Sequence, residues 1–222
     1  MRPGFAFVYA LLLAATIITA IEPSLLEFHA WVKPLLMGSL IIYVVVQGKR
    51  PFPKGLLLLA LVASLAGDVL LLPQIGPHGF LAGLFAFLCA HAIYIYLFTS
   101  VPQKVLEVSF IRKNPWVIFL SILFGLWMFY RLKPGAGDLL WAIVLYMLVI
   151  LTMLVTALDR KGKVSHRSYV LVSMGALLFV ISDSVLAWNR FIEPLSQAPI
   201  WILGTYGLAQ LAIAQGVVLQ SE

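Results

Sequence analysis

Long apolar runs follow one another along the chain, separated by short segments rich in proline, glycine and charge. A helix that crosses a bilayer needs about 20 mostly apolar residues, within a range of about 17–25. The runs that approach this length have cores at 5–21, 32–47, 55–72, 79–98, 116–130, 138–158, 168–188 and 200–219. The pattern therefore predicts an all-α, polytopic membrane bundle of eight transmembrane helices, which forms a single domain over residues 1–222.

The composition supports the membrane interpretation. Hydrophobic residues make up 62% of the 222 residues and charged residues only 11%, against roughly 45–50% and 25% in soluble domains. With a mean hydropathy of +1.02, the chain has more apolar surface than one soluble core of this size could bury. A water-soluble globular protein, a disordered chain and a fibrous repeat are excluded by the same numbers.

The first run has a second interpretation, a cleaved signal peptide, because Arg2 precedes it. Its length and the poor fit of Ile18-Thr19-Ala20 to a small-x-small cleavage site favour a retained helix.

The basic residues predict the orientation of the bundle. An even number of spans puts both termini on one side, together with the segments after the second, fourth and sixth runs. Eleven basic residues fall on that side, namely Arg2, Lys49, Arg50, Lys54, Lys104, Arg112, Lys113, Arg160, Lys161, Lys163 and Arg167. Four fall on the other side, namely Lys33, Arg131, Lys133 and Arg190. The positive-inside rule then places both termini in the cytoplasm, and we expect the membrane to be a bacterial inner membrane.

The net charge of +6 is explained by these topology signals, so no nucleic-acid partner is expected. The single cysteine, Cys89, cannot form an intramolecular disulfide or supply the thiolates of a structural zinc site. Three of the four histidines fall in predicted loops, and His91 alone lies within a span. No metal and no cofactor are therefore expected. A nucleophilic serine elbow and a phosphate-binding glycine loop are also missing from the sequence.

Ionisable side chains are rare inside the predicted spans, where each costs at least about 2.5–3.5 kcal/mol on insertion scales. Three occur there, Asp68, Asp183 and His91. Both aspartates lie close to the outer end of an outward-running span, so both carboxylates are expected roughly 6–8 Å below the outer interface. Two carboxylates in one partly desolvated site tend to differ in protonation, which supplies an acid and a base together. The alternative is that each aspartate, like His91, is only a hydrogen-bonded packing residue.

Further polar side chains lie within the spans and are candidate substrate contacts. Tyr94 follows His91 by one turn on the same helical face. Tyr206 and Gln210 are likewise one turn apart in the last run, and Tyr146 lies in the outer half of its run. Each of them could equally serve helix packing.

Two stretches of the sequence are weakly similar to each other. Gly67-Asp68-Val69-Leu70 and Ser182-Asp183-Ser184-Val185-Leu186 open them, and Ala90-His91 and Ala209-Gln210 close them. The similarity is compatible with a tandem repeat of four plus four helices, in which the two Asp-bearing helices would be equivalent.

Five short motifs follow one another along nearly the whole chain. They are Lys33-Pro34-Leu35-Leu36, Gly67-Asp68, Ala90-His91-x-x-Tyr94, Gly175-x-x-x-Phe179-x-x-Ser182-Asp183 and Tyr206-x-x-x-Gln210. Together they resemble the lysoplasmalogenase family, also called YhhN-like membrane proteins. The resemblance implies hydrolysis of the vinyl ether bond of a lysoplasmalogen, a single-chain ether lysophospholipid. The products would be a fatty aldehyde and glycerophosphoethanolamine or glycerophosphocholine. Another lysolipid or ether lipid is an alternative substrate.

The residues allow this chemistry by a two-carboxylate mechanism. One aspartate would protonate the β-carbon of the enol ether, and the other would activate water. We assign Asp68 as the acid and Asp183 as the base. The opposite assignment is equally compatible with the sequence. Ser182, which directly precedes Asp183 in the sequence, is a further candidate substrate contact. Lys33 and Arg190, basic and outward-facing, are candidates to bind the phosphate, or else interfacial anchors.

Two other classes of function are compatible with the same residues. A lipid or small-solute carrier could use Asp68 and Asp183 as proton-coupling groups, although no predicted span is interrupted at its middle as in broken-helix transporters. A membrane scaffold without a small-molecule site is the other. The sequence leaves the oligomeric state undetermined.

Overall fold

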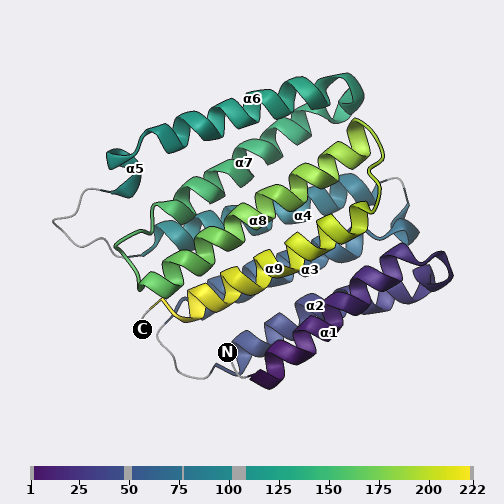
Figure 1. The fold of residues 1–222 in the computed structure, drawn as a ribbon, viewed down its shortest axis with the longest axis horizontal. Coiled ribbons are helices and arrows are strands. Elements are labelled where there is room, and N and C mark those ends of the chain that lie inside the picture. Colours follow the sequence, from purple (N-terminus) through teal and green to yellow (C-terminus); the bar gives the residue numbers. More distant parts are fainter. Residues whose placement is uncertain (1–2, 48–51, 77, 102–108, 221–222) are drawn as a thin grey trace.

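The computed structural model describes residues 3–47, 52–76, 78–101 and 109–220 (Figure 1). All regular elements in these ranges are helical, which confirms the all-α class. The long helices are α1 (Pro3–Ile21), α2 (Leu26–Val45), α3 (Lys54–Leu70), α4 (Gly79–Thr99), α6 (Trp116–Ala136), α7 (Leu140–Leu158), α8 (His166–Phe191) and α9 (Ala198–Val218). Short elements between them are η1 (Pro23–Leu25), η2 (Pro73–Ile75), α5 (Phe110–Lys113) and η3 (Gly137–Leu139).

The eight long helices correspond one to one with the eight predicted runs, but several extend further. α2 begins at Leu26 rather than near residue 32, so Pro34 lies inside the helix instead of near its start. α6 continues through Pro134 to Ala136. In both places the added turns have a mixed composition, so the apolar run is shorter than the helix that contains it.

Six segments of the described chain are long and apolar enough to cross a membrane. They are Gly4–Ile21, Pro23–Val45, Gly79–Thr99, Trp116–Leu158, His166–Phe191 and Ala198–Val218. One of them contains both α6 and α7, and α3, with 17 residues, is not among them. The chain is therefore an integral membrane protein, whereas the number of eight spans and the four-plus-four repeat stay predictions.

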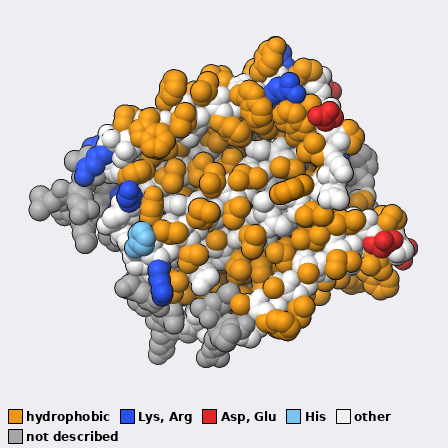
Figure 2. Space-filling view, in the orientation of Figure 1, with side chains coloured by type: hydrophobic (Ala, Val, Ile, Leu, Met, Phe, Trp, Pro, Cys, Tyr) orange, Lys and Arg blue, Asp and Glu red, His pale blue; other side chains and the backbone are white. Residues whose placement is uncertain are grey.

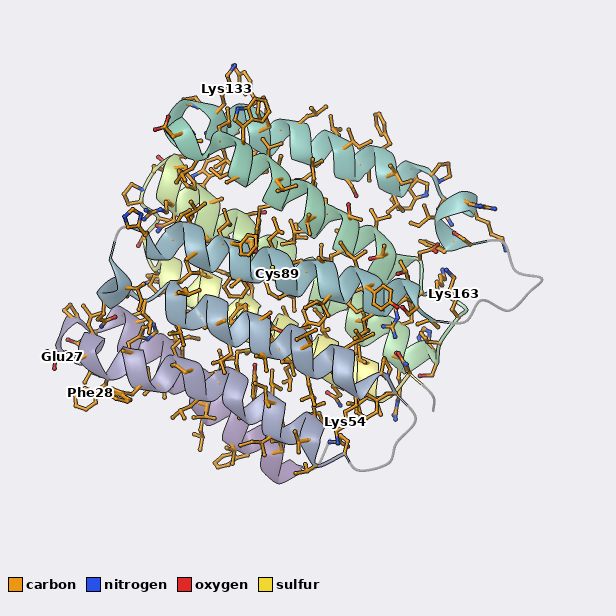
Figure 3. All side chains as sticks on the ribbon, turned by 180° about the vertical axis from the view of Figure 1, so that it is seen from behind. Glu27, Phe28, Lys54, Cys89, Lys133 and Lys163 are labelled. Atoms are coloured by element: carbon orange, nitrogen blue, oxygen red, sulfur yellow. The ribbon has the colours of Figure 1, made fainter. Side chains whose placement is uncertain are left out.

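The helices run side by side along the long axis of the molecule, with both chain ends at the same end of the bundle (Figure 1). α8 and α9 lie in front of α4 and α3, and the view from behind shows the same two layers reversed (Figure 3). α6 lies at one edge of the bundle, and α1 and α2 at the opposite edge. Four basic residues of the predicted topology, Arg2, Lys49, Arg50 and Lys104, lie outside the described residues.

Glycines bring the helices of each layer close together. A Cβ on Gly79 of α4 would lie 2.6 Å from the carbonyl oxygen of Leu70 in α3. A Cβ on Gly175 of α8 would lie 2.8 Å from the carbonyl oxygen of Ala209 in α9. Because neither backbone could approach so closely past a larger side chain, these glycines hold each Asp-bearing helix against the helix that follows it.

The surface is that of a protein surrounded by lipid. Hydrophobic side chains cover the middle of the bundle and charged side chains lie at its ends (Figure 2). Large apolar side chains such as Trp31 and Phe119 are 78% and 65% exposed. Such exposure would be unfavourable in water and is expected against hydrocarbon.

Candidate active site

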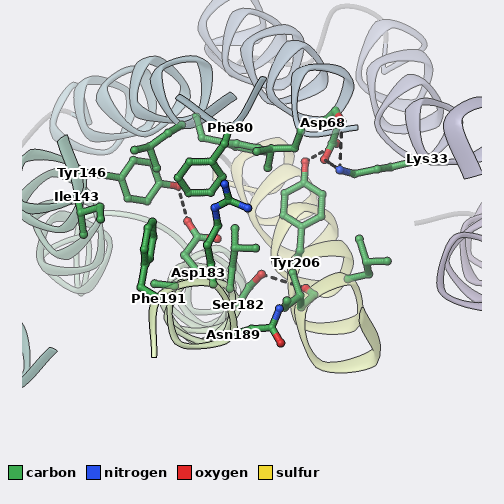
Figure 4. Close-up of a pocket in the computed structure, with 18 residues that line it drawn as sticks. Lys33, Asp68, Phe80, Ile143, Tyr146, Ser182, Asp183, Asn189, Phe191 and Tyr206 are labelled. Carbon is green, nitrogen blue, oxygen red and sulfur yellow. Dashed lines mark hydrogen bonds and ion pairs between the residues drawn. The ribbon is translucent and has the colours of Figure 1, made fainter. Parts of the chain in front are cut away.

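A cavity of about 430 Å³ lies at the end of the bundle opposite the chain termini (Figure 4). Its lining comes from α2, α3, α4, α7, α8 and α9. Phe80 in the first turn of α4 and Phe191 at the end of α8 mark its outer rim. Both aspartates singled out in the sequence, Asp68 and Asp183, line it.

Asp68 lies on one side of the cavity and is paired on both oxygens. The Lys33 Nζ is 3.6 Å from Oδ1, and the Tyr206 hydroxyl donates a hydrogen bond of 2.7 Å to Oδ2. Lys33 also donates to the backbone carbonyl of Asp68 over 3.1 Å. All three side chains are buried, with Asp68 only 2% exposed. The ammonium therefore compensates a carboxylate charge at this position.

Asp183 lies on the opposite side of the cavity, next to Tyr146 (Figure 4). The Tyr146 hydroxyl donates a hydrogen bond to Oδ2 of Asp183. Among the described residues no lysine or arginine forms an ion pair with Asp183. The two carboxylates thus share one cavity but have different partners, an ammonium and a phenol for Asp68 and a phenol alone for Asp183.

Aromatic rings in edge-to-face contact link the two sides beneath the cavity. Phe179 contacts Tyr206 with ring centroids 5.4 Å apart and His91 with centroids 4.5 Å apart. His91 in turn contacts Tyr146 at 5.3 Å, and Phe87 contacts Tyr206 at 5.7 Å. These rings fix the two phenols that hold the carboxylates and separate the cavity from the bundle interior.

Three of the predicted contact residues lie outside the cavity lining, deeper in the bundle. Tyr94 donates a hydrogen bond of 2.7 Å to Oε1 of Gln210 and so joins α4 to α9. His91 is fully buried, and within the described part of the chain neither of its ring nitrogens has a hydrogen-bond partner. The remaining predicted residues, Lys33, Tyr146, Ser182, Arg190 and Tyr206, line the cavity with the two aspartates. Contact of any of these residues with a substrate stays a prediction.

Arg190 lies at the mouth of the cavity and is exposed. Its guanidinium carbon is 4.3 Å from the centre of the Phe80 ring, a cation–π contact that holds the side chain over the opening. Ser182 is buried and donates a hydrogen bond of 3.0 Å to the carbonyl of Ile202. Its hydroxyl therefore joins α8 to α9 beside Asp183.

Several lining residues carry no signal that sequence reasoning could have used. Phe80, Phe87 and Phe191 are apolar residues in or next to apolar runs, so nothing distinguishes them from lipid-facing positions. Asn189 lines the cavity as well, and its Oδ1 accepts a hydrogen bond of 2.8 Å from the Leu195 backbone nitrogen. Its place next to Arg190, near the end of an apolar run, was the one available signal.

A metal site is not visible in the described ranges, where no three His, Cys, Asp or Glu side chains gather closely enough to hold an ion. The cavity instead offers two carboxylates, two phenols, a buried ammonium and an exposed guanidinium. That set can move protons and bind an anionic group at the mouth.

Comparison with known proteins shows which family has this arrangement of motifs. A model of the YhhN family matches residues 28–217. The lysoplasmalogenase TMEM86B of Sus scrofa is 35% identical over 163 residues, which cover 71% of this chain and 61% of that protein. The Homo sapiens TMEM86B lysoplasmalogenase is 34% identical over 155 residues, 69% of this chain and 59% of that protein.

A further relative is less similar to this chain. The lysoplasmalogenase TMEM86A of Bos taurus is 27% identical over 165 residues, 73% of this chain and 65% of that protein. The chain thus matches about three fifths of the length of the pig and human relatives. No solved structure matches the chain.

Proposed function

The chain belongs to the YhhN family, and we propose that it hydrolyses the vinyl ether bond of a lysoplasmalogen within the membrane. The products are a fatty aldehyde and glycerophosphoethanolamine or glycerophosphocholine. The observation that carries this proposal is the pair of carboxylates on opposite sides of one cavity, each held by a tyrosine. The relatives named lysoplasmalogenase support it.

The two carboxylates take different roles because their partners differ. Asp68, next to the Lys33 ammonium, is the carboxylate that accepts a proton from water. Asp183, which has only the Tyr146 hydroxyl, is the acid that donates a proton. This order is the reverse of the one assigned from the sequence, which had no information on the lysine contact.

The reaction begins when Asp183 protonates the β-carbon of the vinyl ether, which leaves an oxocarbenium ion at the carbon bonded to oxygen. Water adds to that carbon while Asp68 takes its proton, and a hemiacetal forms. The carbon–oxygen bond to the glycerol then breaks. Asp68 gives its proton to the departing glycerol oxygen, and Asp183 recovers a proton from the hemiacetal hydroxyl. Both side chains return to their starting state, and one water molecule has been consumed.

The other lining residues position these groups. Lys33 is bound to Asp68, so it holds that carboxylate rather than the phosphate. Arg190 remains exposed at the mouth and is the residue that meets the phosphate. Tyr146 and Tyr206 orient the carboxylates, and Ser182 fixes α8 against α9. No cofactor takes part in this mechanism.

The membrane arrangement that suits this function has eight spans and both termini in the cytoplasm. The cavity then opens near the outer surface, where the head group of a lipid from the outer leaflet reaches Arg190. The predicted tandem repeat would make α3 and α8, which carry the two aspartates, equivalent helices.

The test uses the purified protein in detergent with a lysoplasmalogen and, separately, with the matching ester lysolipid. Release of aldehyde and of fatty acid is followed for the wild type and for Asp68→Asn, Asp183→Asn and Asp138→Asn. Asp138 lies in η3 and does not line the cavity, so Asp138→Asn is the matched control. Aldehyde from the wild type and the control, and none from the other two variants, is the expected result.

Other outcomes reassign the function. Fatty acid from the ester lysolipid without aldehyde would indicate a lysophospholipase. Full activity in both cavity variants would overturn the two-carboxylate mechanism. Neither product, together with pH-driven uptake of an unchanged lipid into vesicles, would indicate a carrier that uses the same aspartates.

A further inference from the structure

A long apolar groove lies between α6 and α7, on the side of the bundle that faces lipid. Its volume is about 470 Å³, and its walls are Ile118, Ile122 and Leu126 on α6 and Leu148, Leu151 and Val155 on α7, with neighbouring residues between them. Two hydroxyls also line it, but Ser121 and Thr152 each donate to a carbonyl of their own helix, Val117 and Leu148. The groove therefore presents no free hydrogen-bonding group and suits a hydrocarbon chain.

The groove and the active-site cavity each share wall residues with a third hollow that lies between them. A small cavity of about 50 Å³ lies between α6, α7 and α8. Tyr146 and Asp183 line both this small cavity and the active-site cavity. Met147 and Leu151 line both the small cavity and the groove. Three hollows thus follow one another from the carboxylates to the lipid-facing side of α6.

The series of hollows runs from the mouth along the length of the bundle, toward the end where the chain termini lie. Along α8, Arg190 lines the mouth, Asp183 the reaction site and Val180 the small cavity, a path of about 15 Å at a rise of about 1.5 Å per residue. The groove spans Phe129 to Ile118 along α6, a length of about 16 Å. That length is close to the hydrocarbon of one leaflet, about half of the roughly 30 Å core.

Polarity falls in the same direction. The mouth has a guanidinium and the reaction site two carboxylates, whereas the groove is lined by apolar side chains and internally bonded hydroxyls. A single-chain phospholipid has this order of groups: a phosphate, an ether and then a hydrocarbon chain. The narrow middle part is bordered by Met128 and Met147, whose flexible side chains adapt to a passing chain at low cost.

We propose that the groove between α6 and α7 binds the hydrocarbon chain of the substrate, which reaches it past Tyr146 and Asp183. The identity of the lipid rests on the proposed function, whereas the chain site itself rests on the shared walls of the three hollows and on the apolar lining of the groove. Gly125 has a specific role in this site. Its missing side chain leaves the groove open, since a Cβ there would lie 3.1 Å from the Leu151 Cδ1.

Tryptophan substitutions on the lipid-facing side of α7 test the site without disturbing the core. Leu148 lines the groove and is 58% exposed, whereas Leu145, on the same helix and 54% exposed, does not line it. In lipid nanodiscs we expect Leu148→Trp to lower kcat/KM for a hexadecenyl lysoplasmalogen by at least about tenfold, because several buried methylenes lose their contacts. The octenyl substrate should be unaffected, and Leu145→Trp should match the wild type on both.

A second variant measures depth. Thr152 lines the groove one turn deeper than Leu148. As the substrate chain is lengthened, the fall in kcat/KM should therefore begin at a longer chain in Thr152→Trp than in Leu148→Trp. Equal losses on the octenyl and hexadecenyl substrates, or the same chain-length profile in Leu148→Trp and Leu145→Trp, would overturn the proposal.

A binding measurement separates this proposal from the proposed function. The probe is a saturated alkyl-ether lysophosphatidylcholine with a diazirine at the end of its chain, which vinyl ether chemistry cannot cleave. Photolabelling should map to the groove residues of α6 and α7 and be lost in Leu148→Trp. If the wild type releases no aldehyde but is labelled there, the proposed function fails and the chain site stands. Labelling at α1 or α2 instead, or equal labelling by a two-chain phosphatidylcholine probe, would overturn the chain site.

Discussion

The Lys33 Nζ lies 3.6 Å from Oδ1 of Asp68 and donates to the backbone carbonyl of the same residue over 3.1 Å. One lysine thus binds both the side chain and the backbone of one aspartate, next to the last turn of α3. Lys33 is on α2, so this contact fixes the cavity-side ends of α2 and α3 relative to each other. It also accounts for a buried lysine at a depth where an unpaired ammonium would be costly.

Removal of the ammonium should destabilise the protein more than removal of the whole pair. Lys33→Met leaves the Asp68 carboxylate buried without its cation, and we expect a loss of about 3–5 kcal/mol of folding free energy. Lys33→Met combined with Asp68→Asn should recover most of this loss, because no charge is left unpaired, and still release no aldehyde. Thermal unfolding and activity in the same detergent measure both effects. A double variant as unstable as Lys33→Met would show that an unpaired Asp68 carboxylate is not the cause of the loss.

The hydrogen bond from Tyr146 to Asp183 should affect the chemical step rather than binding. Tyr146→Phe removes a bond to the acid that protonates the substrate, worth about 1.5–3 kcal/mol. We expect kcat to fall about tenfold to a hundredfold with KM nearly unchanged. Tyr9→Phe is the matched control. Tyr9 is buried and its hydroxyl donates a hydrogen bond of 2.7 Å to the Gly207 carbonyl, and it does not line the cavity. A fall in kcat of the same size in both variants would indicate a general effect of losing a buried hydroxyl.

Arg190 should determine affinity for the phosphate. Arg190→Gln removes the guanidinium at the mouth, and we expect KM for a lysoplasmalogen to rise about tenfold with kcat unchanged. The wild-type KM should increase with salt, and that of the variant should respond much less. Arg131→Gln is the control, because Arg131 lies over the Trp188 ring at 4.8 Å and does not line the cavity. A KM in Arg190→Gln equal to that of the control would remove Arg190 from the phosphate site.

The fold was predictable from the sequence because each long helix carries its own signal. A helix in hydrocarbon satisfies its backbone hydrogen bonds internally, so a sufficient apolar run nearly dictates it. The limits of the helices were less predictable. The first turns of α2, which contain Glu27 and His29, and the last turns of α6, which contain Lys133, are helical but of mixed composition.

The candidate site was predictable only where a residue is costly in the membrane. Asp68 and Asp183 stood out for that reason, and the structure places both in one cavity. Contacts between helices could not be predicted, because they depend on how each helix is rotated about its axis. The sequence indicated Lys33 as a candidate for the substrate phosphate or as an interfacial anchor, and its contact with Asp68 was not predictable. It grouped Gln210 with the substrate contacts, whereas its Oε1 accepts a hydrogen bond from Tyr94 below the cavity.

At the end of the bundle where the chain termini lie, Asp159 anchors the short helix α5 and should give the protein a pH-dependent stability. Its carboxylate follows the end of α7 and accepts hydrogen bonds from Ser109 Oγ at 2.5 Å, the Ile111 backbone nitrogen at 2.9 Å and Lys163 Nζ at 2.6 Å. Burial raises the pKa of Asp159, but the hydrogen bonds from Lys163, Ser109 and Ile111 outweigh it, so the pKa lies below its ordinary value.

A carboxyl whose pKa is lower in the folded protein stabilises the fold while it is ionised. The stabilisation by Asp159 is therefore complete above the unfolded value of about 3.9 and is lost as the pH falls through the lower folded pKa. At pH near 7, Asp159→Asn should lower the melting temperature by about 2–4 °C, a modest effect because the group is partly exposed. Near pH 3 the difference in melting temperature between the variant and the wild type should become smaller. Asp138→Asn, at the other end of the bundle, is the control variant in the same measurement. A difference in melting temperature between Asp159→Asn and the wild type that stays constant with pH would rule out the carboxylate charge of Asp159 as its cause.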